Sequence, residues 1–444
     1  MSARDVLIEG GTVVTLDDDR RVFEGDVLLR QGRIAGVGGR GAFQPSPGTR
    51  TVDARGSYVM PGFVQPHVHL CQTLFRGLAE DRALLPWLEE RIWPLEGAHS
   101  EASLRASARL GIGELLLGGT TTCLDMGTVH HSDVLFETAR DLGIGYVGGK
   151  AMMDAGQGVP QGLLESTDES LAVSVALAGR WHGAEGGRLR YAFAPRFVLS
   201  CTERLMREAA LAARESGCLL HTHASENPGE VEAVRAALGK DNAVALHELG
   251  YTGPDVVLAH GVWLSEAEVE LLSRTKTGIA HCPSTNLKLG SGIARIPELL
   301  RAGIPVGIAA DGAACNNRLS AFSELRLAAL LPKLQYGAAA LPAADALWLA
   351  TRGGAKLLGL DGEVGVLAEG ARADVIVVDG QAPHLRPRAD PYTTLVYAAE
   401  AGDVRHVFVE GEWLVRSGDL LRVELGALLD DAERELSLLR ARLP

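Results

Sequence analysis

Histidines and acidic residues recur in this sequence at the points where short apolar runs end. His67 and His69 are separated by one residue, and the same spacing returns at His221 and His223, with Glu226 three residues farther on. Later apolar runs end at single polar residues: His260, His281 and Asp311. Because residues two apart on a strand point to the same face, each histidine pair can direct two imidazoles toward one point.

This combination of side chains is typical of a transition-metal site. Three imidazoles with one carboxylate and an open position for water favour Zn²⁺ or Fe²⁺, whereas Mg²⁺ and Ca²⁺ prefer oxygen ligands. A metal of this kind lowers the pKa of its bound water toward about 7 and generates hydroxide at neutral pH. Glu226 lies at the edge of the following loop, where a carboxylate can move a proton to a leaving group. The residues therefore indicate metal-assisted hydrolysis.

The elements that must position these side chains alternate between strands and helices. Helical patterns such as residues 203–214 and 265–272 separate apolar runs rich in β-forming residues. These runs cover residues 58–64, 120–125, 145–150, 189–194, 218–223, 256–260, 278–281 and 306–311. Eight such units over roughly 300 residues predict an α/β fold, a TIM-type (β/α)₈ barrel, whose catalytic groups gather at the carboxyl ends of the strands. An open doubly wound sheet is the alternative, but its glycine-rich phosphate loop does not follow the first run.

Both ends of the chain have a different sequence pattern, which is typical of short strands with alternating polarity and frequent turns. We expect strands at residues 5–9, 11–16, 25–29, 33–37 and 51–53, and again at 373–379, 404–409 and 412–415. The pattern predicts a small antiparallel sheet and one β-sandwich domain assembled from both termini. The expected division is 1–58 for its N-terminal part, 59–362 for the barrel, and 363–444 for its C-terminal part with a surface helix at about 422–442.

Composition excludes several classes of function. The 444 residues include 43 lysines and arginines against 56 acidic residues, for a net charge of −13, so we expect no nucleic-acid partner and no binding to anionic membranes. No apolar run approaches the ~18 residues of a membrane span, and the first residues contain no apolar signal region. The six cysteines are dispersed without a Cys-X-X-Cys pair, which is typical of a reduced, cytoplasmic protein.

Several motifs together carry a family resemblance that spans residues 5 to 415. The chain resembles the amidohydrolase superfamily and, within it, the cytosine, guanine and adenosine-type deaminases and the related s-triazine hydrolases. The matching segments are Pro61-Gly-Phe-Val-Gln-Pro-His-Val-His, His223-Ala-Ser-Glu, Leu258-Ala-His, Ala280-His-Cys-Pro-Ser-Thr-Asn-Leu-Lys-Leu, Ala310-Asp-Gly-Ala-Ala-Cys-Asn-Asn and Gly365-Val-Leu-Ala-Glu-Gly-Ala-Arg-Ala-Asp-Val-Ile-Val-Val-Asp. The resemblance implies a hydrolase in which homo-oligomers are common.

The resemblance also implies roles for the strand-end residues. One divalent metal, Zn²⁺ or alternatively Fe²⁺, would be bound by His67, His69, His223 and Asp311. Glu226 would deliver a proton to the ring nitrogen, Asp311 would pass the water's proton to the departing amine, and His260 would orient the water. Relatives with two metals carry a bridging lysine where this chain has Ala194-Pro195-Arg196, which favours one metal. The roles of His221 and His281 stay open between packing and a supporting contact.

The substrate-binding segments resemble two different groups of deaminases. Residues 69–81 and 87–96 are similar to deaminases of 5′-substituted adenosines, in which a glutamate at the position of Glu96 binds the ribose hydroxyls. Residues 195–201 are similar to guanine deaminases, in which the arginine at Arg196 and a glutamine placed like Gln72 read the purine. Trp87 and Lys150 complete the expected set of substrate contacts.

We therefore expect a cytoplasmic hydrolytic deaminase that removes the exocyclic amine of a 6-aminopurine nucleoside of the 5′-deoxyadenosine, methylthioadenosine or S-adenosylhomocysteine type. The alternatives are a deaminase of guanine or another oxopurine, and an s-triazine amino- or chlorohydrolase. A hypothesis from another class of function is that the chain is a non-catalytic binding protein with the same fold. The intact set of metal-ligating and acidic residues argues against it.

Overall fold

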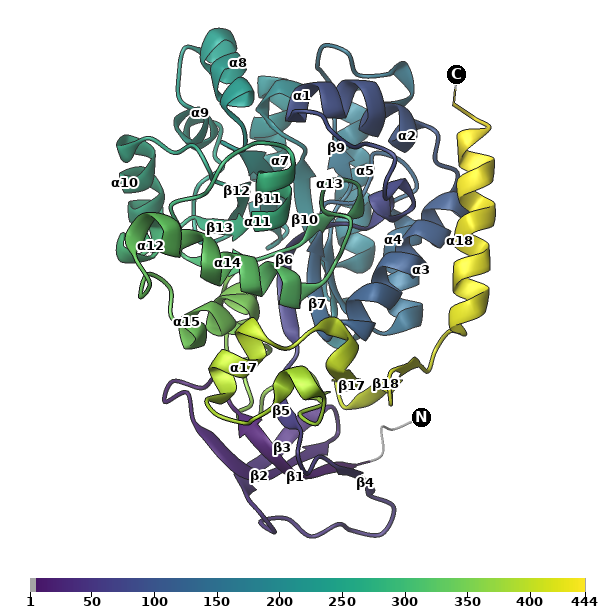
Figure 1. Ribbon diagram of the computed structural model, residues 1–444. Coiled ribbons are helices and arrows are strands. Elements are labelled where there is room, and N and C mark those ends of the chain that lie inside the picture. The colour runs from purple at the N-terminus through teal and green to yellow at the C-terminus, as the bar shows by residue number, and fades with distance from the viewer. Residues whose placement is uncertain (1–4, 444) are drawn as a thin grey trace.

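Parallel strands and helices alternate through the centre of the chain, and the strands form the inner sheet of a barrel (Figure 1). The computed structural model describes residues 5–443. In chain order the barrel strands are β6 (Phe63–His69), β7 (Thr120–Asp125), β8 (Gly145–Gly148), β10 (Leu189–Pro195), β11 (Leu219–Ala224), β12 (Val256–His260), β13 (Gly278–His281) and β14 (Val306–Ile308). Nearly every residue in them is buried, as expected for parallel strands that are covered on both faces.

The last strand is split in two, and this split closes the barrel. β14 pairs with β13 on one side, and the two-residue strand β15 (Asp311–Gly312) pairs with β6 on the other. Because β14 and β15 follow one another directly in the chain, the first and last barrel strands become neighbours. A further short strand, β9 (Ala151–Met152), pairs with the end of β10. The predicted (β/α)₈ barrel is confirmed.

Helices surround the barrel. Side chains at the N-termini of several of them cap the free backbone amides of the first turn. The side chain of Ser100 caps α3 (Glu101–Leu117), and Ser265 with Glu268 forms a reciprocal capping box at α10 (Glu266–Thr275). The other helices of the barrel are α4 (Asp133–Leu142), α5 (Thr167–Trp181), α6 (Ala184–Gly187), α7 (Glu203–Glu215), α8 (Pro228–Leu238), α9 (Asn242–Glu248), α11 (Pro283–Lys288), α12 (Ile296–Arg301), α13 (Ala313–Asn316), α14 (Ala321–Tyr336), α15 (Ala343–Trp348) and α16 (Gly354–Leu357). The helices predicted at 203–214 and 265–272 correspond to α7 and α10.

A short helical segment covers the upper end of the barrel in Figure 1. It consists of α1 (Leu84–Trp87), the π-helical turn η2 (Leu88–Ile92) and α2 (Trp93–Gly97). It follows the 3₁₀ turn η1 (Leu70–Phe75), which comes directly after β6. The segment is therefore connected to the strand that ends in His67 and His69.

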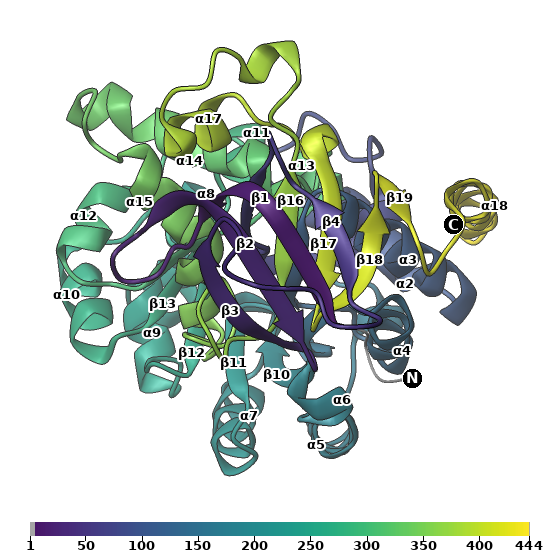
Figure 2. The ribbon, with the colours of Figure 1, turned by 90° about the horizontal axis from the view of Figure 1, so that it is seen from below.

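Strands from both ends of the chain form a second sheet below the barrel (Figure 2). They are β1 (Val6–Val14), β2 (Val22–Arg30), β3 (Arg33–Gly39), β4 (Arg50–Asp53), β5 (Tyr58–Pro61), β16 (Val375–Val378), β17 (Val404–Val409), β18 (Glu412–Arg416) and β19 (Asp419–Leu420). The two ends join where β5 pairs with β16, and both contribute to one apolar core that includes Val13, Val375 and Phe408. The predicted β domain built from both termini is confirmed.

Two details of this sheet differ from the sequence expectation. The strands expected at 5–9 and 11–16 are one strand, β1, which contains a bulge between Ile8 and Gly11 where Gly10 has a φ of +71°. The sheet is also mixed instead of antiparallel, because β4 and β5 both run parallel to β1. Residues 1–4 and 444, at the ends of the predicted segments 1–58 and 363–444, lie outside the described residues, and the division at 58 and 362 stays a prediction.

The C-terminal helix α18 (Leu425–Arg440) lies along the side of the barrel in Figure 1, close to the range predicted for it. Its buried residues Leu428, Ala432 and Leu439 form its inner face, and it packs against α3. A helix α17 (Pro391–Tyr397) packs against α14 and α15. Among residues 5–443, no helix combines the length and apolarity that crossing a membrane requires.

Candidate active site

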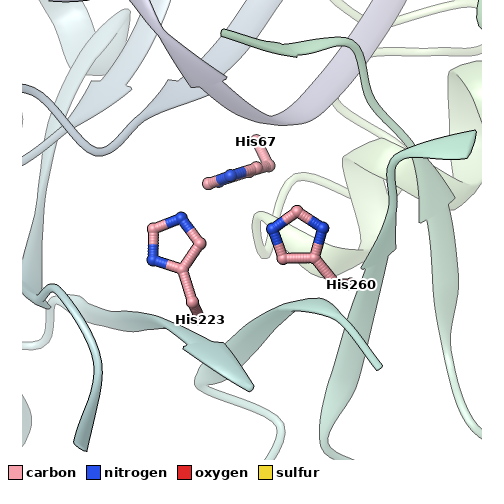
Figure 3. A group of neighbouring side chains, drawn as sticks. All are labelled: His67, His223 and His260. Atoms are coloured by element: carbon pink, nitrogen blue, oxygen red, sulfur yellow. The ribbon is translucent and has the colours of Figure 1, made fainter. Parts of the chain in front are cut away.

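The polar residues at the strand ends converge at the mouth of the barrel. They come from separate strands: His67 and His69 from β6, His221 and His223 from β11, His260 from β12 and Asp311 from β15. Figure 3 shows the imidazole rings of His67, His223 and His260 gathered around one point. One ring nitrogen of each of these three histidines lies within 4.8 Å of the other two. The fold therefore assembles a cluster from residues far apart in sequence.

The four residues predicted to bind a metal are all part of this cluster. Nε2 of His69 lies 3.2 Å from Nε2 of His223. Oδ1 of Asp311 lies 3.3 Å from Nε2 of His67 and 3.5 Å from Nε2 of His69. His67, His69 and Asp311 are buried, and His223 is half-buried. Each of the four residues therefore has a donor atom within 3.5 Å of a donor atom of another.

A chain of hydrogen bonds fixes the orientation of His67. Nδ1 of His221 lies 2.9 Å from the carbonyl oxygen of Val257, so His221 donates from Nδ1 and accepts at Nε2. Nδ1 of His67 lies 2.8 Å from that Nε2 and therefore carries the proton of the bond. The lone pair of His67 is left on Nε2, which faces the centre. This arrangement gives His221, whose role was open from the sequence, a supporting contact to His67.

Two more imidazoles are held in the same manner. Nδ1 of His223 donates to the carbonyl oxygen of Arg196 at 2.7 Å, which leaves the Nε2 lone pair toward the centre. Nδ1 of His260 lies 3.0 Å from the side-chain oxygen of Asn286, so its Nε2 lone pair faces Glu226 and Asp311. In both rings a hydrogen bond on one side determines which nitrogen is available on the other.

The cluster fits a divalent transition metal. Burial lowers the pKa of His67, His69 and His223 well below 6.5, so these imidazoles are neutral and have free lone pairs. Nε2 of His67 is buried without a hydrogen-bond partner in the protein. Neutral imidazole nitrogens beside a carboxylate are the donors that Zn²⁺ and Fe²⁺ prefer.

A thiol that the sequence analysis did not single out lies at the same centre. The sulfur of Cys282, which precedes α11, shares a 4.8 Å cluster with donor atoms of His67 and Asp311. Burial raises the pKa of Cys282 well above 9.0, so it is a neutral thiol at neutral pH. Because the thiolate is the metal-binding form, the imidazoles and Asp311 are the stronger ligand set.

Glu226 lies beside the cluster as a buried acid. Its Oε2 is 3.3 Å from Nε2 of His260. Burial, followed by the charge of Asp311, raises the pKa of Glu226 well above 4.5 and so favours its protonated form. A protonated carboxyl in this position can act as a general acid.

The backbone around Glu226 is fixed by the start of α8. The amide of Glu226 donates to Oε2 of Glu230 at 2.7 Å, and Asn227 and Glu230 form a capping box. Oε1 of Glu230 accepts from the side-chain amide of Asn242 at 2.6 Å. Sequence reasoning missed Glu230, although the Asn-X-X-Glu spacing after Glu226 was a detectable capping signal.

Two residues of the site adopt a left-handed backbone. His260 has a φ of +75° and Asp311 a φ of +64°. Such a conformation costs roughly 1–3 kcal/mol for a residue other than glycine and is found most often at functional sites. His260 is the last residue of β12 and Asp311 is the first residue of β15, so both conformations occur at a strand boundary.

A narrow cavity lies next to the cluster. Among the predicted substrate contacts, Trp87 and Arg196 line it, together with the reaction-centre residues His223, Glu226, His260 and Asp311. The rest of the lining is Leu84, Leu88, Phe197, Glu230, Leu289 and Cys315. The apolar residues among them were missed because hydrophobic side chains on a pocket wall have the same sequence pattern as core residues.

Gln72, Glu96 and Arg196 form one buried network. Arg196 donates from Nη1 to Oε2 of Glu96 at 2.5 Å and from Nη2 to Oε1 at 3.1 Å. Gln72 donates to the same Oε1 at 2.9 Å, while its own side-chain oxygen has no partner in the protein. The sequence analysis assigned Glu96 and the Arg196–Gln72 pair to two different substrates, whereas the structure joins all three.

Gln72 and Glu96 are not part of the cavity lining, and neither are Lys150 and His281. Lys150 is buried, forms an ion pair with Glu165 and donates to the carbonyl oxygen of Ala151 at 3.2 Å. Lys150 is not among the residues that line the cavity, and its expected substrate contact stays a prediction. His281 is buried at the end of β13, and burial lowers its pKa to about 3.

Comparison with known proteins agrees with this geometry. Residues 58–414 match the model of the amidohydrolase family. A 5-methylthioadenosine/S-adenosylhomocysteine deaminase of Halobacterium salinarum is 39% identical over 98% of both chains, and a 5′-deoxyadenosine deaminase of Methanosarcina mazei is 34% identical over 99% of both. The crystal structure of a zinc-bound adenosine deaminase from Xanthomonas campestris superimposes with a TM-score of 0.93 at 30% identity, covering 99% of each chain. With the barrel, the histidine cluster and these end-to-end matches in agreement, the chain belongs to the amidohydrolase family.

Proposed function

We propose that this enzyme is a metal-dependent hydrolytic deaminase that releases ammonia from the 6-amino group of a purine nucleoside. The observation that carries the proposal is the buried carboxyl of Glu226, which lies 3.3 Å from His260 beside the histidine cluster and lines the adjoining cavity. The names of the relatives support the substrate class, because two of them are deaminases of 5′-substituted adenosines.

We propose one zinc ion per chain, with iron as the alternative. The residues that would hold it are His67, His69, His223 and Asp311. When bound, such a metal acts as a Lewis acid that makes hydroxide available at neutral pH. The zinc-bound structure of a relative supports the identity of the metal.

The protein's own groups account for the proton movements of the reaction. Glu226 would donate its proton to the ring nitrogen next to the amine-bearing carbon, which makes that carbon more electrophilic. His260 lies 3.3 Å from Glu226 and 3.8 Å from Asp311, where its Nε2 can accept a hydrogen bond from the attacking water. Asp311 would take one proton of the water and transfer it to the amine, which leaves as ammonia, and the second proton of the water would return to Glu226 as the ring carbonyl forms. The ring carbon gains the oxygen of water and loses nitrogen.

The Arg196–Glu96–Gln72 network would contact the purine and its sugar. The two oxygens of Glu96 accept three hydrogen bonds from Arg196 and Gln72, and the Cys71 thiol lies 4.0 Å from Oε1, so a further donor would compete with these contacts. The free side-chain oxygen of Gln72 adds another acceptor. Together these groups can accept hydrogen bonds from the hydroxyls of a ribose.

The same network favours a second candidate, deamination of guanine or another oxopurine. Arg196 is a cationic donor on the cavity wall, and such a group can bind the carbonyl oxygen of an oxopurine. An s-triazine substrate is less well supported, because we identify no residue here that would bind it specifically. A non-catalytic role is less well supported, because it gives the buried acid Glu226 no function.

Compartment and assembly are further parts of the proposal. We infer a cytoplasmic enzyme, because the six cysteines are buried and unpaired within residues 5–443. The partner is a small purine-type molecule, and a homo-oligomer is consistent with the family resemblance.

An ammonia-release screen of the purified, zinc-loaded enzyme tests the function. The panel contains adenosine, 5′-deoxyadenosine, 5′-methylthioadenosine, guanine, a pterin and an aminotriazine. We expect the highest kcat/KM with an adenine nucleoside. A higher value for guanine would replace the first candidate with the second, and no release from any compound would contradict both.

A further inference from the structure

A buried carboxyl lies behind the reaction centre, in the first turn of α14. It belongs to Glu324, whose side chain is fully buried. In the part of the chain that the structure describes, Glu324 belongs neither to the cavity lining nor to the groups of metal-ligating side chains. Burying a carboxyl is unfavourable unless its oxygens are hydrogen-bonded, so an apolar side chain would pack α14 against α11 more favourably. The hydrogen bonds of Glu324 therefore indicate its role.

The carboxylate accepts three hydrogen bonds from two different segments. Ser284, in α11, donates from its backbone amide to Oε2 at 3.0 Å and from its hydroxyl to Oε1 at 2.6 Å. Asn316, the last residue of α13, donates from its side-chain amide to the same Oε1 at 2.8 Å. One carboxylate thus connects the helical turn after β13 to the helical turn after β15.

The contact with Asn316 leads to Asp311. The side-chain nitrogen of Asn316 also donates to the carbonyl oxygen of Ala310 at 2.7 Å, and Ala310 directly precedes Asp311. Because both hydrogens of the Asn316 amide have an acceptor, the orientation of this amide is determined. Asp311 has a φ of +64°, and a left-handed residue of this kind persists only where its surroundings hold it. Glu324 therefore acts on the backbone of Asp311 through Asn316.

The contact with Ser284 leads to His260. Ser284 lies in the first turn of α11, where backbone amides have no acceptor within the helix. Asn286, two residues farther along α11, accepts from Nδ1 of His260 at 3.0 Å. A shift of this turn would move the oxygen that determines which nitrogen of His260 is available at the reaction centre. Glu324 therefore acts on His260 through the position of α11.

We propose that Glu324 is a positioning residue, which holds Asp311 and His260 in a fixed arrangement through Asn316 and α11. The two residues come from different strands, β15 and β12, and the proposed mechanism requires both to contact one water molecule. A misplacement of about 1 Å can lower a rate by roughly 10²-fold. This inference rests on the proposed function, from which Asp311 and His260 take their roles.

Glu324→Met removes the acceptors and keeps an unbranched side chain of similar length. With saturating zinc and the best substrate of the ammonia-release screen, we expect kcat to fall by at least about tenfold. KM should change by less than about threefold, because Glu324, Ser284 and Asn316 are not among the residues that line the cavity. Competition with a chelator should show zinc binding weakened by about 10–100-fold, as expected when the support of a ligand is lost.

Glu268→Met is the matched control. Glu268 is also a buried glutamate in the first turn of a helix, α10, and it accepts from the backbone amides of Ser265 and Ala243, both at 2.7 Å. These contacts connect α10 to α9 and do not involve Asp311 or His260. The control variant should also lose stability in urea unfolding, while it keeps the kcat and the zinc affinity of the wild type.

Glu324→Gln tests the conservative replacement. Its single oxygen can accept from Asn316 and from the Ser284 hydroxyl at the position of Oε1, while its amide then faces the backbone amide of Ser284. One hydrogen bond is lost instead of three, so kcat should lie between those of the wild type and the methionine variant. We expect it to be at least about threefold below the wild type.

A kcat within about twofold of the wild type in a folded, zinc-loaded Glu324→Met variant would overturn the inference. An equal loss of kcat in the Glu268 control would overturn it as well, and an unchanged zinc affinity would overturn the link to Asp311. If the methionine variant does not fold, the kcat criterion applies to Glu324→Gln. A wild-type enzyme that releases ammonia from no compound of the screen would instead contradict the proposed function.

Discussion

Arg196 and Glu96 form a buried, bidentate ion pair, although 99 residues separate them in the chain. The pair lies at the edge of the substrate cavity, which Arg196 lines. Removal of one partner leaves an uncompensated buried charge on the other. The two residues are therefore expected to respond to substitution as a unit.

We expect Glu96→Leu and Arg196→Met each to lower the free energy of unfolding by about 3–5 kcal/mol, and the double variant to recover most of this loss. Both single variants should reduce kcat/KM for adenine nucleosides and for guanine alike. Urea unfolding and steady-state kinetics measure the two effects. Selective loss of one substrate class would show that the residues act separately.

His69→Ala is expected to remove the metal and abolish turnover while the barrel stays folded. The reason is that the imidazole of His69 lies at the centre of the cluster, 3.2 Å from that of His223. Elemental analysis and circular dichroism measure metal content and folding, with the exposed His247→Ala as control. We expect about one metal per chain in the wild type, and two tightly held metals would contradict the proposed stoichiometry.

Glu226→Gln should retain the metal and lose about 10²–10⁴-fold in kcat, the usual contribution of a positioned acid. The amide keeps the shape of the side chain but cannot supply the proton. Glu232→Gln, an exposed change on the same helix α8, is the matched control. A kcat near that of the wild type would assign Glu226 a structural role only.

His221→Leu should weaken metal binding by about 10–100-fold, because the proton on Nδ1 of His67 loses its acceptor. His221→Gln offers both a donor and an acceptor and should restore much of the affinity. Competition with a chelator measures this without reference to turnover. Equal affinities for the leucine and glutamine variants would show that the hydrogen bond does not position His67.

Asp374 predicts a pH dependence of stability in the β domain. Burial raises its pKa from 3.8 to about 7, while its Oδ1 accepts from the amide of Glu410 at 2.8 Å. Between these two pH values the folded state binds the proton more strongly than the unfolded state, so stability falls as pH rises from about 4 to about 7. Above pH 7 this contribution is constant.

Asp374→Asn keeps the acceptor and removes the titration, so it should flatten this slope by an amount on the order of a few kcal/mol. Urea unfolding at pH 4.5, 6 and 7.5 measures the slope, with the exposed Asp430→Asn as control. A slope that persists unchanged in the asparagine variant would assign the pH dependence to other buried acids.

The barrel and the convergence of the histidines could be predicted because their signal is local. An apolar run that ends in His-X-His or Ala-His gives both the strand and the position of the polar side chains at its end. The pairing of Arg196 with Glu96 and of Lys150 with Glu165 could not be predicted. A charged side chain has the same sequence signal whether it faces a substrate or a distant partner.

The parallel direction of β4 and β5 relative to β1 could also not be predicted from the sequence. Short alternating strands predict a sheet, but parallel or antiparallel pairing depends on how the connecting loops cross it. The role of Glu230 could be predicted only in part. Its capping-box spacing is visible in the sequence, whereas its hydrogen bond to the amide of Glu226 depends on the bend at Ser225, where φ is +53°.

The pairing of β5 with β16 has a consequence for synthesis on the ribosome. β5 ends at Pro61, two residues before the first barrel strand, yet its neighbour in the sheet begins at Val375. The base of the first strand therefore lacks its support until nearly the whole chain has emerged. The nascent N-terminal strands expose an unpaired edge throughout elongation, a species that is prone to aggregate. Slowed translation beyond the barrel, or a truncation before residue 375, should accordingly reduce the yield of soluble protein even though every catalytic residue has already been made.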